Sequence, residues 1–209
     1  MTEHSAPRID HVIIASRDVP ATAARLARDH GIVAQAGGSH PGWGTYNWIA
    51  PLGGAYLEVI GIEDAELAAR DPLGRAVLGI ADRLDALIGF AVEVDDVAAT
   101  GDRLDLTVER GARDRPDGTR LSWLLAGRPE CGLGARPFFI QWHDRASRPG
   151  LLPQRRERAL AGIAWLETGG DADALAAWAG PGLPVRCDGS TSGVVAVAIA
   201  TADGQVVLG

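Results

Sequence analysis

The stretch HPGWGTYNWIAPLGGAYLEVI, from His40 to Ile60, decides the fold of this 209-residue chain. It predicts a glycine-rich loop that leads into two short strands joined by a tight turn. Because successive side chains of a strand point to opposite faces, Tyr56 and Glu58 share one face of the second strand with Ile60. Such a polar row is typical of the solvated face of an antiparallel sheet, but the large aromatics in this stretch favour a surface that faces a ligand.

The first of the two strands adds polar groups to the same region. The alternation predicts one face with Trp43, Thr45 and Asn47 and an opposite face with Gly44, Tyr46 and Trp48. Only one of the two tryptophans is therefore expected to face a ligand. A carboxylate, an amide, a hydroxyl and an indole should lie on neighbouring segments.

A strand and a helix precede this stretch. His11 lies in the middle of a run of β-branched residues that is typical of a buried strand. Asp18 is a plausible N-cap and Gly31 a plausible residue after the last helical turn. The first unit is therefore predicted as strand 9–15, helix 20–30, short strand 32–36, a break at glycines 37–38 and the two strands already described.

The same order of elements returns later in the chain. IDHVIIASRDV, residues 9–19, aligns by eye with LIGFAVEVDDV, residues 87–97, and YLE at 56–58 aligns with FIQ at 139–141. A repeat of this length implies a duplicated unit whose copies pack together to close one core. A third and shorter copy follows a basic, proline-bounded linker, and we interpret it as an extension of the sheet or a cover for its edge.

These patterns predict an α+β fold made of tandem βαβββ units. The expected parts are a first unit at 8–62, a helical connector at 63–85, a second unit at 86–145, a linker at 146–160 and a partial third unit at 161–209.

The composition excludes several classes of partner. The formal net charge is −7 and no basic run is present, which argues against nucleic acid or anionic membranes. Cys131 and Cys187 lie far apart and indicate reduced thiols rather than a disulfide framework or a structural zinc site. No signal peptide and no membrane-spanning run is recognisable, so a cytoplasmic protein is expected.

A paired βαβββ unit with His11 in its first strand and Glu58 in its last strand resembles the vicinal oxygen chelate superfamily. The segment HPGWGTYN ahead of YLE is most similar to the glyoxalase-like branch of that superfamily. The resemblance covers about residues 8–145. It implies that each unit curls into a half-barrel and that the two units form an open cup.

The resemblance also implies a divalent metal ion, held by the first and last strand of each unit. Residue by residue, the four positions are His11, Glu58, Gly89 and Gln141. Gly89 has no side chain, so Gln141, His143 or His40 would have to complete a site for Mg²⁺, Mn²⁺, Fe²⁺, Ni²⁺ or Zn²⁺. The alternative, which the missing ligand favours, is a metal-free cup in which His11 and Glu58 form an acid–base pair.

Further residues are expected to bind the substrate. The candidates are His40, Trp43, Thr45, Asn47, Tyr56 and Gln141. Trp123 and Trp142 are expected to pack in the core of the second unit. Arg120 and Arg136 could bind an anionic substrate, but solvated surface positions are the simpler interpretation.

Three functions follow from these features. The first is a glyoxalase-like small-molecule enzyme, of the lyase, isomerase or dioxygenase type, with His11 and Glu58 as catalytic residues. The second is a non-catalytic protein that binds or sequesters a small molecule in the same cup. The third is an interaction protein with a vestigial cup, which the polar row disfavours because an unused cup would tend to fill with apolar side chains. A homodimer is compatible with each of them.

Overall fold

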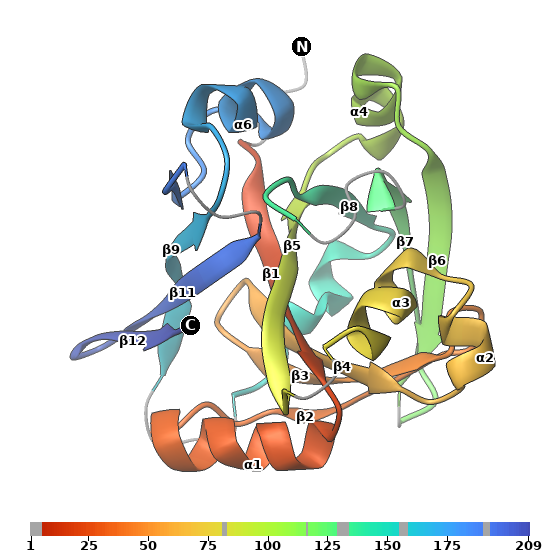
Figure 1. Cartoon of the computed structure of the whole chain (residues 1–209), viewed down its shortest axis with the longest axis vertical. Helices are drawn as coiled ribbons and strands as arrows, with labels where there is room; N and C mark the ends of the chain where they lie inside the picture. The colour runs from red at the N-terminus through yellow and green to blue at the C-terminus, as the bar shows by residue number, and fades with distance from the viewer. Residues whose placement is uncertain (1–5, 81–82, 116, 129–133, 155–158, 190–192) are drawn as a thin grey trace.

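The structure is a computed structural model that describes residues 6–80, 83–115, 117–128, 134–154, 159–189 and 193–209. It contains a large sheet and a smaller C-terminal sheet (Figure 1). The strands of the large sheet are β1 (Arg8–Ser16), β2 (Gln35–His40), β3 (Thr45–Pro51), β4 (Tyr56–Ile62), β5 (Asp85–Glu93), β6 (Val108–Asp114), β7 (Arg120–Ala126) and β8 (Phe138–Trp142). Those of the smaller sheet are β9 (Leu160–Thr168), β10 (Val185–Cys187), β11 (Val194–Thr201) and β12 (Gly204–Leu208). The helices are α1 (Val19–His30), α2 (Ala65–Ala68), α3 (Pro72–Leu78), α4 (Val97–Leu104), η1 (Arg145–Ser147), η2 (Pro149–Leu151) and α6 (Ala172–Ala179).

The large sheet joins the two predicted units into one cup. Its strand order is β2-β3-β4-β1-β5-β8-β7-β6, so the first strands of the two units pair antiparallel at its centre. Each unit closes on its own first strand through a parallel pair, β1 with β4 and β5 with β8. The sheet curls until its outer strands β2 and β6 meet, where Arg113 donates a hydrogen bond to the carbonyl of Gly37. The predicted α+β cup of tandem βαβββ units is thus confirmed.

The helix caps predicted from the sequence are present. Asp18 accepts a hydrogen bond from the backbone N–H of Ala21, and Gly31 ends α1 in the left-handed conformation at φ 66°. Asp96 caps α4 in the same way. The two N-caps, Asp18 and Asp96, start each helix shortly after the first strand of its unit.

Strand β1 is buried on both faces. Val12 and Ile14 belong to the core cluster on the convex side of the sheet, while Ile13 and Ala15 belong to the cluster inside the cup. The strand is therefore a nearly continuous apolar run, as expected for a strand at the centre of a three-layered structure. The buried polar side chains Asp10 and His11 interrupt this apolar run.

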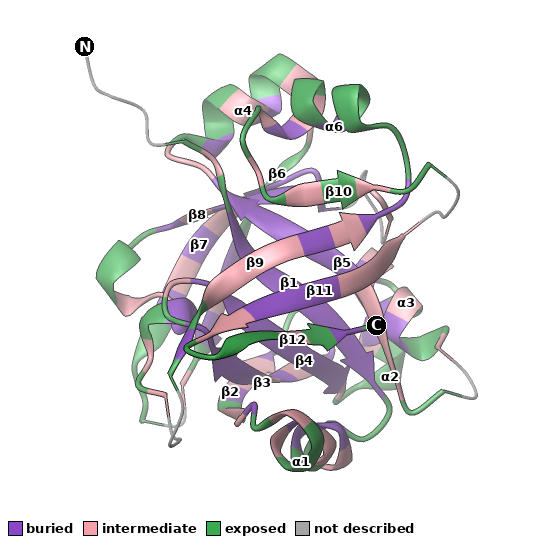
Figure 2. Cartoon of the chain, turned by 90° about the vertical axis from the view of Figure 1, so that its left-hand side faces the viewer, coloured by how far each residue is buried: buried purple, intermediate pink, exposed green. Residues whose placement is uncertain are grey.

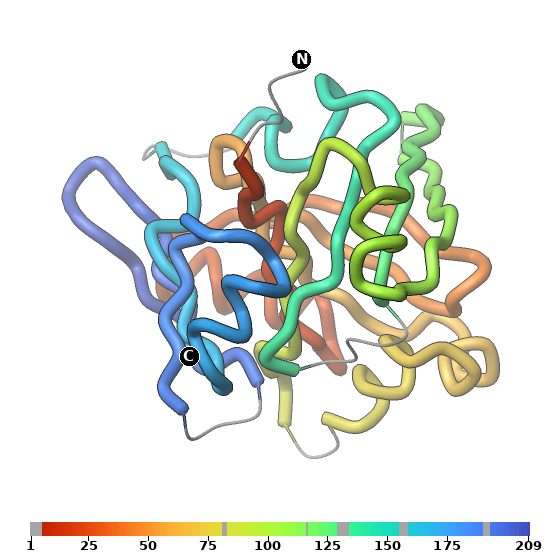
Figure 3. Tube along the Cα trace, turned by 90° about the horizontal axis from the view of Figure 1, so that it is seen from above, coloured from red at the N-terminus to blue at the C-terminus, as the bar shows by residue number. Residues whose placement is uncertain are grey.

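The third unit forms a sheet of its own, which corrects the expectation that it extends the large sheet or covers its edge. Its strands have the order β10-β9-β11-β12 and pack across the convex face of β1 and β5 (Figure 2). Leu166, Val197 and Ile199 share one core cluster with Phe90. Seen from above, the C-terminal unit lies to one side of the two cup-forming units (Figure 3). The apolar outer face of the cup explains this position, because an edge offers less apolar area to bury.

The predicted strand 32–36 lies elsewhere. The observed strand β2 runs from Gln35 to His40 and includes both glycines that were expected to break it. Its pairing with β3 shifts register between Ala36 and Gly38, and Gly38 has a φ of 140°. The two glycines do not end the strand; they allow its backbone to lie close to the neighbouring strands.

The structure bears on two further predictions, the lack of a membrane-spanning segment and the reduced state of the cysteines. Within the described ranges, no helix is long and apolar enough to cross a membrane. Cys187 is a free thiol in β10, whereas Cys131 lies outside the described residues.

Candidate functional site

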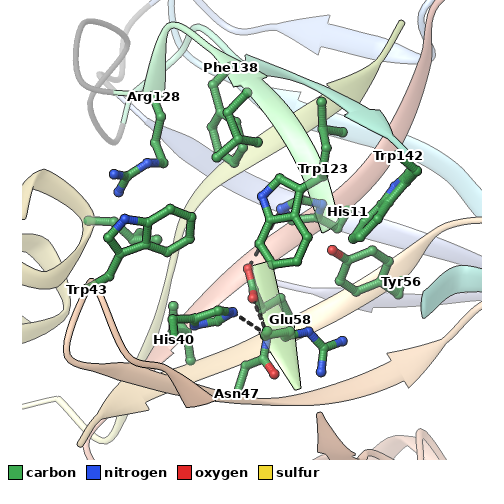
Figure 4. Close-up of a pocket in the computed structure, with 15 residues that line it drawn as sticks. His11, His40, Trp43, Asn47, Tyr56, Glu58, Trp123, Arg128, Phe138 and Trp142 are labelled. Carbon is green, nitrogen blue, oxygen red and sulfur yellow. Dashed lines mark hydrogen bonds and ion pairs between the residues drawn. The ribbon is translucent and has the colours of Figure 1, made fainter. Parts of the chain in front are cut away.

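A cavity opens inside the cup (Figure 4), with an empty volume of about 430 Å³ that includes its solvent-filled mouth. Its polar lining consists of His11, His40, Asn47, Glu58, Arg113 and Arg128. Its aromatic lining consists of Trp43, Tyr56, Trp123, Phe138 and Trp142. Both units contribute, so the cavity exists only when the two half-barrels are assembled.

His11 is held rigidly at the inner end of the cavity. Its Nδ1 lies 2.6 Å from Asp10 Oδ1, and Trp142 Nε1 donates to the other oxygen of that carboxylate at 2.8 Å. The ring of Tyr56 stacks on the imidazole at a centroid distance of 4.7 Å. Because the carboxylate accepts a hydrogen bond from Nδ1, it favours the tautomer that carries its proton on Nδ1 and a lone pair on Nε2.

Glu58 faces that lone pair. Its Oε2 lies 3.7 Å from His11 Nε2, and its Oε1 accepts a hydrogen bond from the side-chain amide of Asn47. Both carboxylate oxygens therefore have defined positions in a side chain that is buried. The two titratable groups flank a common point from neighbouring strands (Figure 4).

His40 supports this arrangement from the end of β2. Its Nδ1 forms a hydrogen bond with Thr45 Oγ1 at 3.1 Å, and its Nε2 lies 3.4 Å from the amide nitrogen of Asn47. Burial of the imidazole lowers the pKa of His40 from 6.5 to about 4, an effect that the nearby carboxylate of Glu58 partly opposes. His40 is therefore neutral at pH 7 and serves as a fixed hydrogen-bonding group.

This burial predicts a pH dependence of stability. The unfolded chain binds a proton at His40 with a pKa near 6.5 and the folded chain only near 4, so unfolding takes up a proton between these values. The contribution to stability is complete above pH 6.5 and falls by about 3 kcal/mol as the pH drops to about 4. Urea unfolding between pH 7 and pH 4 should show this loss in the wild type and not in His40→Gln. His143→Gln, at an exposed position, is the matched control and should follow the wild type; equal slopes in all three proteins would contradict the assignment.

Arg128 and Trp43 form the wall of the cavity opposite His11. The guanidinium of Arg128 lies 4.2 Å from the centre of the Trp43 ring. It also pairs with Asp71, the N-cap of α3, at 2.6 Å and with Glu109 of β6 at 2.9 Å. This buried cation is thus fully compensated, and it ties three elements together.

Arg113 comes from the edge of the second unit. It is only 3% exposed, and it donates a hydrogen bond to the backbone carbonyl of Gly37 that closes the seam between β2 and β6. Burial lowers the pKa of the Arg113 guanidinium, and the nearby Tyr56 and Glu58 partly oppose this decrease.

Gly37 gives these side chains their room. A Cβ at this position would collide with Asn47 Oδ1 and crowd Ile49 and Arg113. Gly37→Ala should therefore lower the free energy of unfolding by about 1–3 kcal/mol, the range for overpacking of a tight interior. Gly42→Ala is the matched control, because a Cβ at Gly42 meets no atom within 4 Å. Urea unfolding of both variants checks the prediction, and an equal effect of the two would contradict it.

The structure brings most of the predicted site residues together. Those that line the cavity are His11, His40, Trp43, Asn47, Tyr56 and Glu58. Thr45 lies behind His40 and reaches the site only through its hydrogen bond to that ring. Trp43 faces the cavity from the turn before β3, whereas Trp48 packs on the convex side, in agreement with the expectation that one tryptophan faces a ligand. Trp123 and Trp142 were expected in the core, but they also line the cavity.

Gln141 is not part of this site, contrary to the prediction. Its Oε1 accepts a hydrogen bond from the backbone N–H of Val97 at the start of α4, on the convex side of β8. The cavity is lined instead by Ile140 and Trp142, its neighbours in the strand. The observed pairing shows the reason: Glu58 pairs with Ile13 and Phe138 with Ala91, the counterpart of Ile13 in the second unit. The true counterpart of Glu58 is thus Phe138, three residues before Gln141.

The donor set does not fit the four-position metal centre that the resemblance implies. Gly89 has no side chain, Phe138 is apolar and Gln141 faces away. His11 and Glu58 supply two donors where a catalytic centre usually has about three protein ligands. Over the described residues, no group of three or more histidine, cysteine, aspartate or glutamate side chains is placed to hold a metal ion.

Sequence reasoning missed Asp10, Arg113 and Arg128. Asp10 precedes His11 directly, and strict alternation would point the two side chains to opposite faces. A register shift in the pairing of β1 with β5 between Ile9 and His11 allows both to meet. The arginines suggested by the sequence lie elsewhere: Arg120 pairs with Asp114 on the surface, and Arg136 lies over Trp178.

Comparison with known proteins yields one family and several structures. Residues 9–182 match the sequence profile of a family described as glyoxalase-like domain. A hypothetical protein from Staphylococcus aureus has a crystal structure similar to this chain, with a TM-score of 0.64 and 15% sequence identity over 90% of this chain and 88% of that chain. At this identity the similarity shows the fold alone.

Methylmalonyl-CoA epimerases are more distant structural neighbours. The enzyme from Mycobacterium tuberculosis has a TM-score of 0.43 and 16% identity, over 64% of this chain and 85% of that chain. A Streptomyces coelicolor variant in complex with 2-nitronate-propionyl-CoA has a TM-score of 0.45 and 20% identity, over 66% and 94%. No curated protein matches the chain.

Proposed function

Because the chain belongs to the family of glyoxalase-like domains, we propose that it is a small-molecule enzyme that moves a proton on its substrate, as an isomerase or lyase does. The observation that supports this proposal is the pair His11 Nε2 and Glu58 Oε2, which face each other at 3.7 Å inside a buried cavity. A general base and a general acid at one point are the requirement for proton transfer at carbon.

His11 is suited to act as the base. Asp10 accepts a hydrogen bond from Nδ1–H and so leaves the lone pair of Nε2 directed into the cavity. The same carboxylate would stabilise the imidazolium that forms when Nε2 takes a proton. The hydrogen bond from Trp142 holds the Asp10 carboxylate in place, and stacking on Tyr56 holds the His11 ring.

Glu58 is suited to be the second group. Asn47 holds one of its oxygens, which leaves the other directed at the point that His11 also faces. His11 removes a proton from one carbon of the substrate, and Glu58 in its protonated form delivers a proton to the substrate. The proton on His11 then passes through solvent to the Glu58 carboxylate, which restores both groups. Such an isomerisation needs no further reactant, and the two-donor set supports this chemistry better than a dioxygenase reaction, which depends on a complete metal centre.

Hydrogen exchange at carbon tests this function without knowledge of the natural substrate. The protein is incubated in D₂O with a panel of small carbonyl compounds that carry an acidic C–H bond, and ¹H NMR follows the loss of the C–H signal. Exchange of at least one compound above the buffer rate is expected. Exchange of none, with binding of several detected by thermal shift, would overturn the enzyme in favour of a binder.

That second candidate, a binding protein, has one observation in its favour. Five aromatic side chains line the cavity, which is typical of a surface that holds a flat apolar ligand. A binder has no use for a histidine whose tautomer is set by a carboxylate, so the enzyme remains the better supported proposal.

A further inference from the structure

Arg113 is a buried cation without a full partner. Its side chain reaches the cavity from β6, and the residue is 3% exposed. Among the residues that the structure describes, no carboxylate oxygen lies within 4.0 Å of its guanidinium nitrogens. The carbonyl of Gly37 accepts one of its N–H groups. Burial of a guanidinium in this way costs several kcal/mol unless a negative group compensates it.

The neighbouring cavity arginine shows what compensation looks like in this protein. Arg128 is 7% exposed and pairs with two carboxylates, those of Asp71 and Glu109. Its charge is already balanced by these two carboxylates. Arg113 therefore remains as the cavity cation that is open to a ligand anion.

A polar group close to Arg113 lacks a hydrogen-bond partner in the described part of the chain. Asn47 Oδ1 is buried and has no hydrogen-bond donor within the described part of the chain. A Cβ at Gly37 would collide with this oxygen and crowd Arg113 Nη1, so both groups lie close to each other against the backbone of Gly37. Buried polar groups are rarely left unpaired. Because Oδ1 only accepts hydrogen bonds, the group that completes it is a donor, such as a ligand hydroxyl or a water beside the anion.

We propose that Arg113 binds the carboxylate of the ligand, and that the substrates of the cavity are therefore small organic acids. This inference rests on the proposed function, since it assigns the substrate class of the same site. The guanidinium offers parallel N–H donors that match a carboxylate in a bidentate pair. The carbon chain then lies against the aromatic wall, and the C–H bond next to the carboxylate comes within reach of His11 and Glu58.

One other place could hold the anion. Arg113 also borders a groove outside the seam between β2 and β6, together with Arg115 and Asp117. Arg115 directly follows β6 and donates a hydrogen bond to the backbone carbonyl of Ser147. Replacement of Arg115 therefore shows whether an anion binds in this groove rather than in the cavity.

The test uses isobutyrate and isobutyramide, which have the same shape and differ in charge. Quenching of tryptophan fluorescence reports binding, because three tryptophans line the cavity. The wild type should bind isobutyrate at least about tenfold more tightly than isobutyramide, as a charge-assisted pair implies. Arg113→Gln should remove this preference, and Arg115→Gln should retain it.

Arg113→Lys is a second variant, which tests the proposal if the glutamine variant fails to fold. It keeps the charge but loses the bidentate geometry, so a reduced preference for isobutyrate is expected. Equal affinity of the wild type for both probes, no binding of either, or loss of the preference only in Arg115→Gln would each overturn the proposal. Because the experiment measures binding and not turnover, it tests the role of Arg113 even if the protein proves not to be an enzyme.

Discussion

Replacement of His11 by glutamine is expected to slow enzyme-catalysed exchange of the carbon-bound hydrogen by about a hundredfold to ten-thousandfold, the usual contribution of a positioned acid–base group. The amide of glutamine has no basic nitrogen, whereas Nε2 of His11 faces Glu58 at 3.7 Å. The measurement is the initial rate of deuterium incorporation from D₂O into the compound that the exchange screen identifies.

Asp10→Asn should reduce the same rate through the tautomer of His11. An asparagine amide can donate to Nδ1, which would place the imidazole proton on Nε2 and remove the base from the cavity. The ¹⁵N NMR signals of the ring report this change directly. His143→Gln is the matched control for loss of a histidine, since that side chain is exposed. Retention of exchange in His11→Gln, in a folded protein, would exclude His11 as the base.

Replacement of Glu93 by alanine is expected to lower the free energy of unfolding by about 3 kcal/mol, the low end for loss of one partner from a buried ion pair. The carboxylate of Glu93 is 1% exposed and contacts Arg8 at 2.6 Å, Arg145 at 2.8 Å and Arg148 at 3.1 Å. Arg148 is 11% exposed and would be left with uncompensated charge, while the two other arginines can turn to solvent. Urea unfolding at pH 7 gives the difference.

The pair Arg120–Asp114 is the matched control for this loss. Both side chains are more than 60% exposed, so Asp114→Ala should cost less than about 1 kcal/mol. The double variant Glu93→Ala with Arg148→Ala should recover part of the loss, because it removes the stranded charge. A loss in Glu93→Ala no larger than that in Asp114→Ala would show that the network does not stabilise the fold.

Local patterns in the sequence predicted most of the secondary structure. The carboxylate of Asp18 and the left-handed Gly31 mark the ends of α1, and both signals act within a few residues of the helix. The alternation in β4 placed Tyr56 and Glu58 together in the cavity for the same reason. The glycines 37–38 misled the prediction, because they allow close contact with Asn47 and Arg113 instead of breaking the strand.

The sequence by itself therefore determined the duplicated βαβββ order, the helix caps and the side of the strand that carries Glu58. Tertiary structure decided the rest of the site: the outward turn of Gln141, the meeting of Asp10 with His11 and the burial of Arg113. The physical reason is that caps and alternation depend on neighbours in the chain. Strand register, a bulge in one pair and the closure of β2 against β6 depend on contacts between residues far apart in sequence.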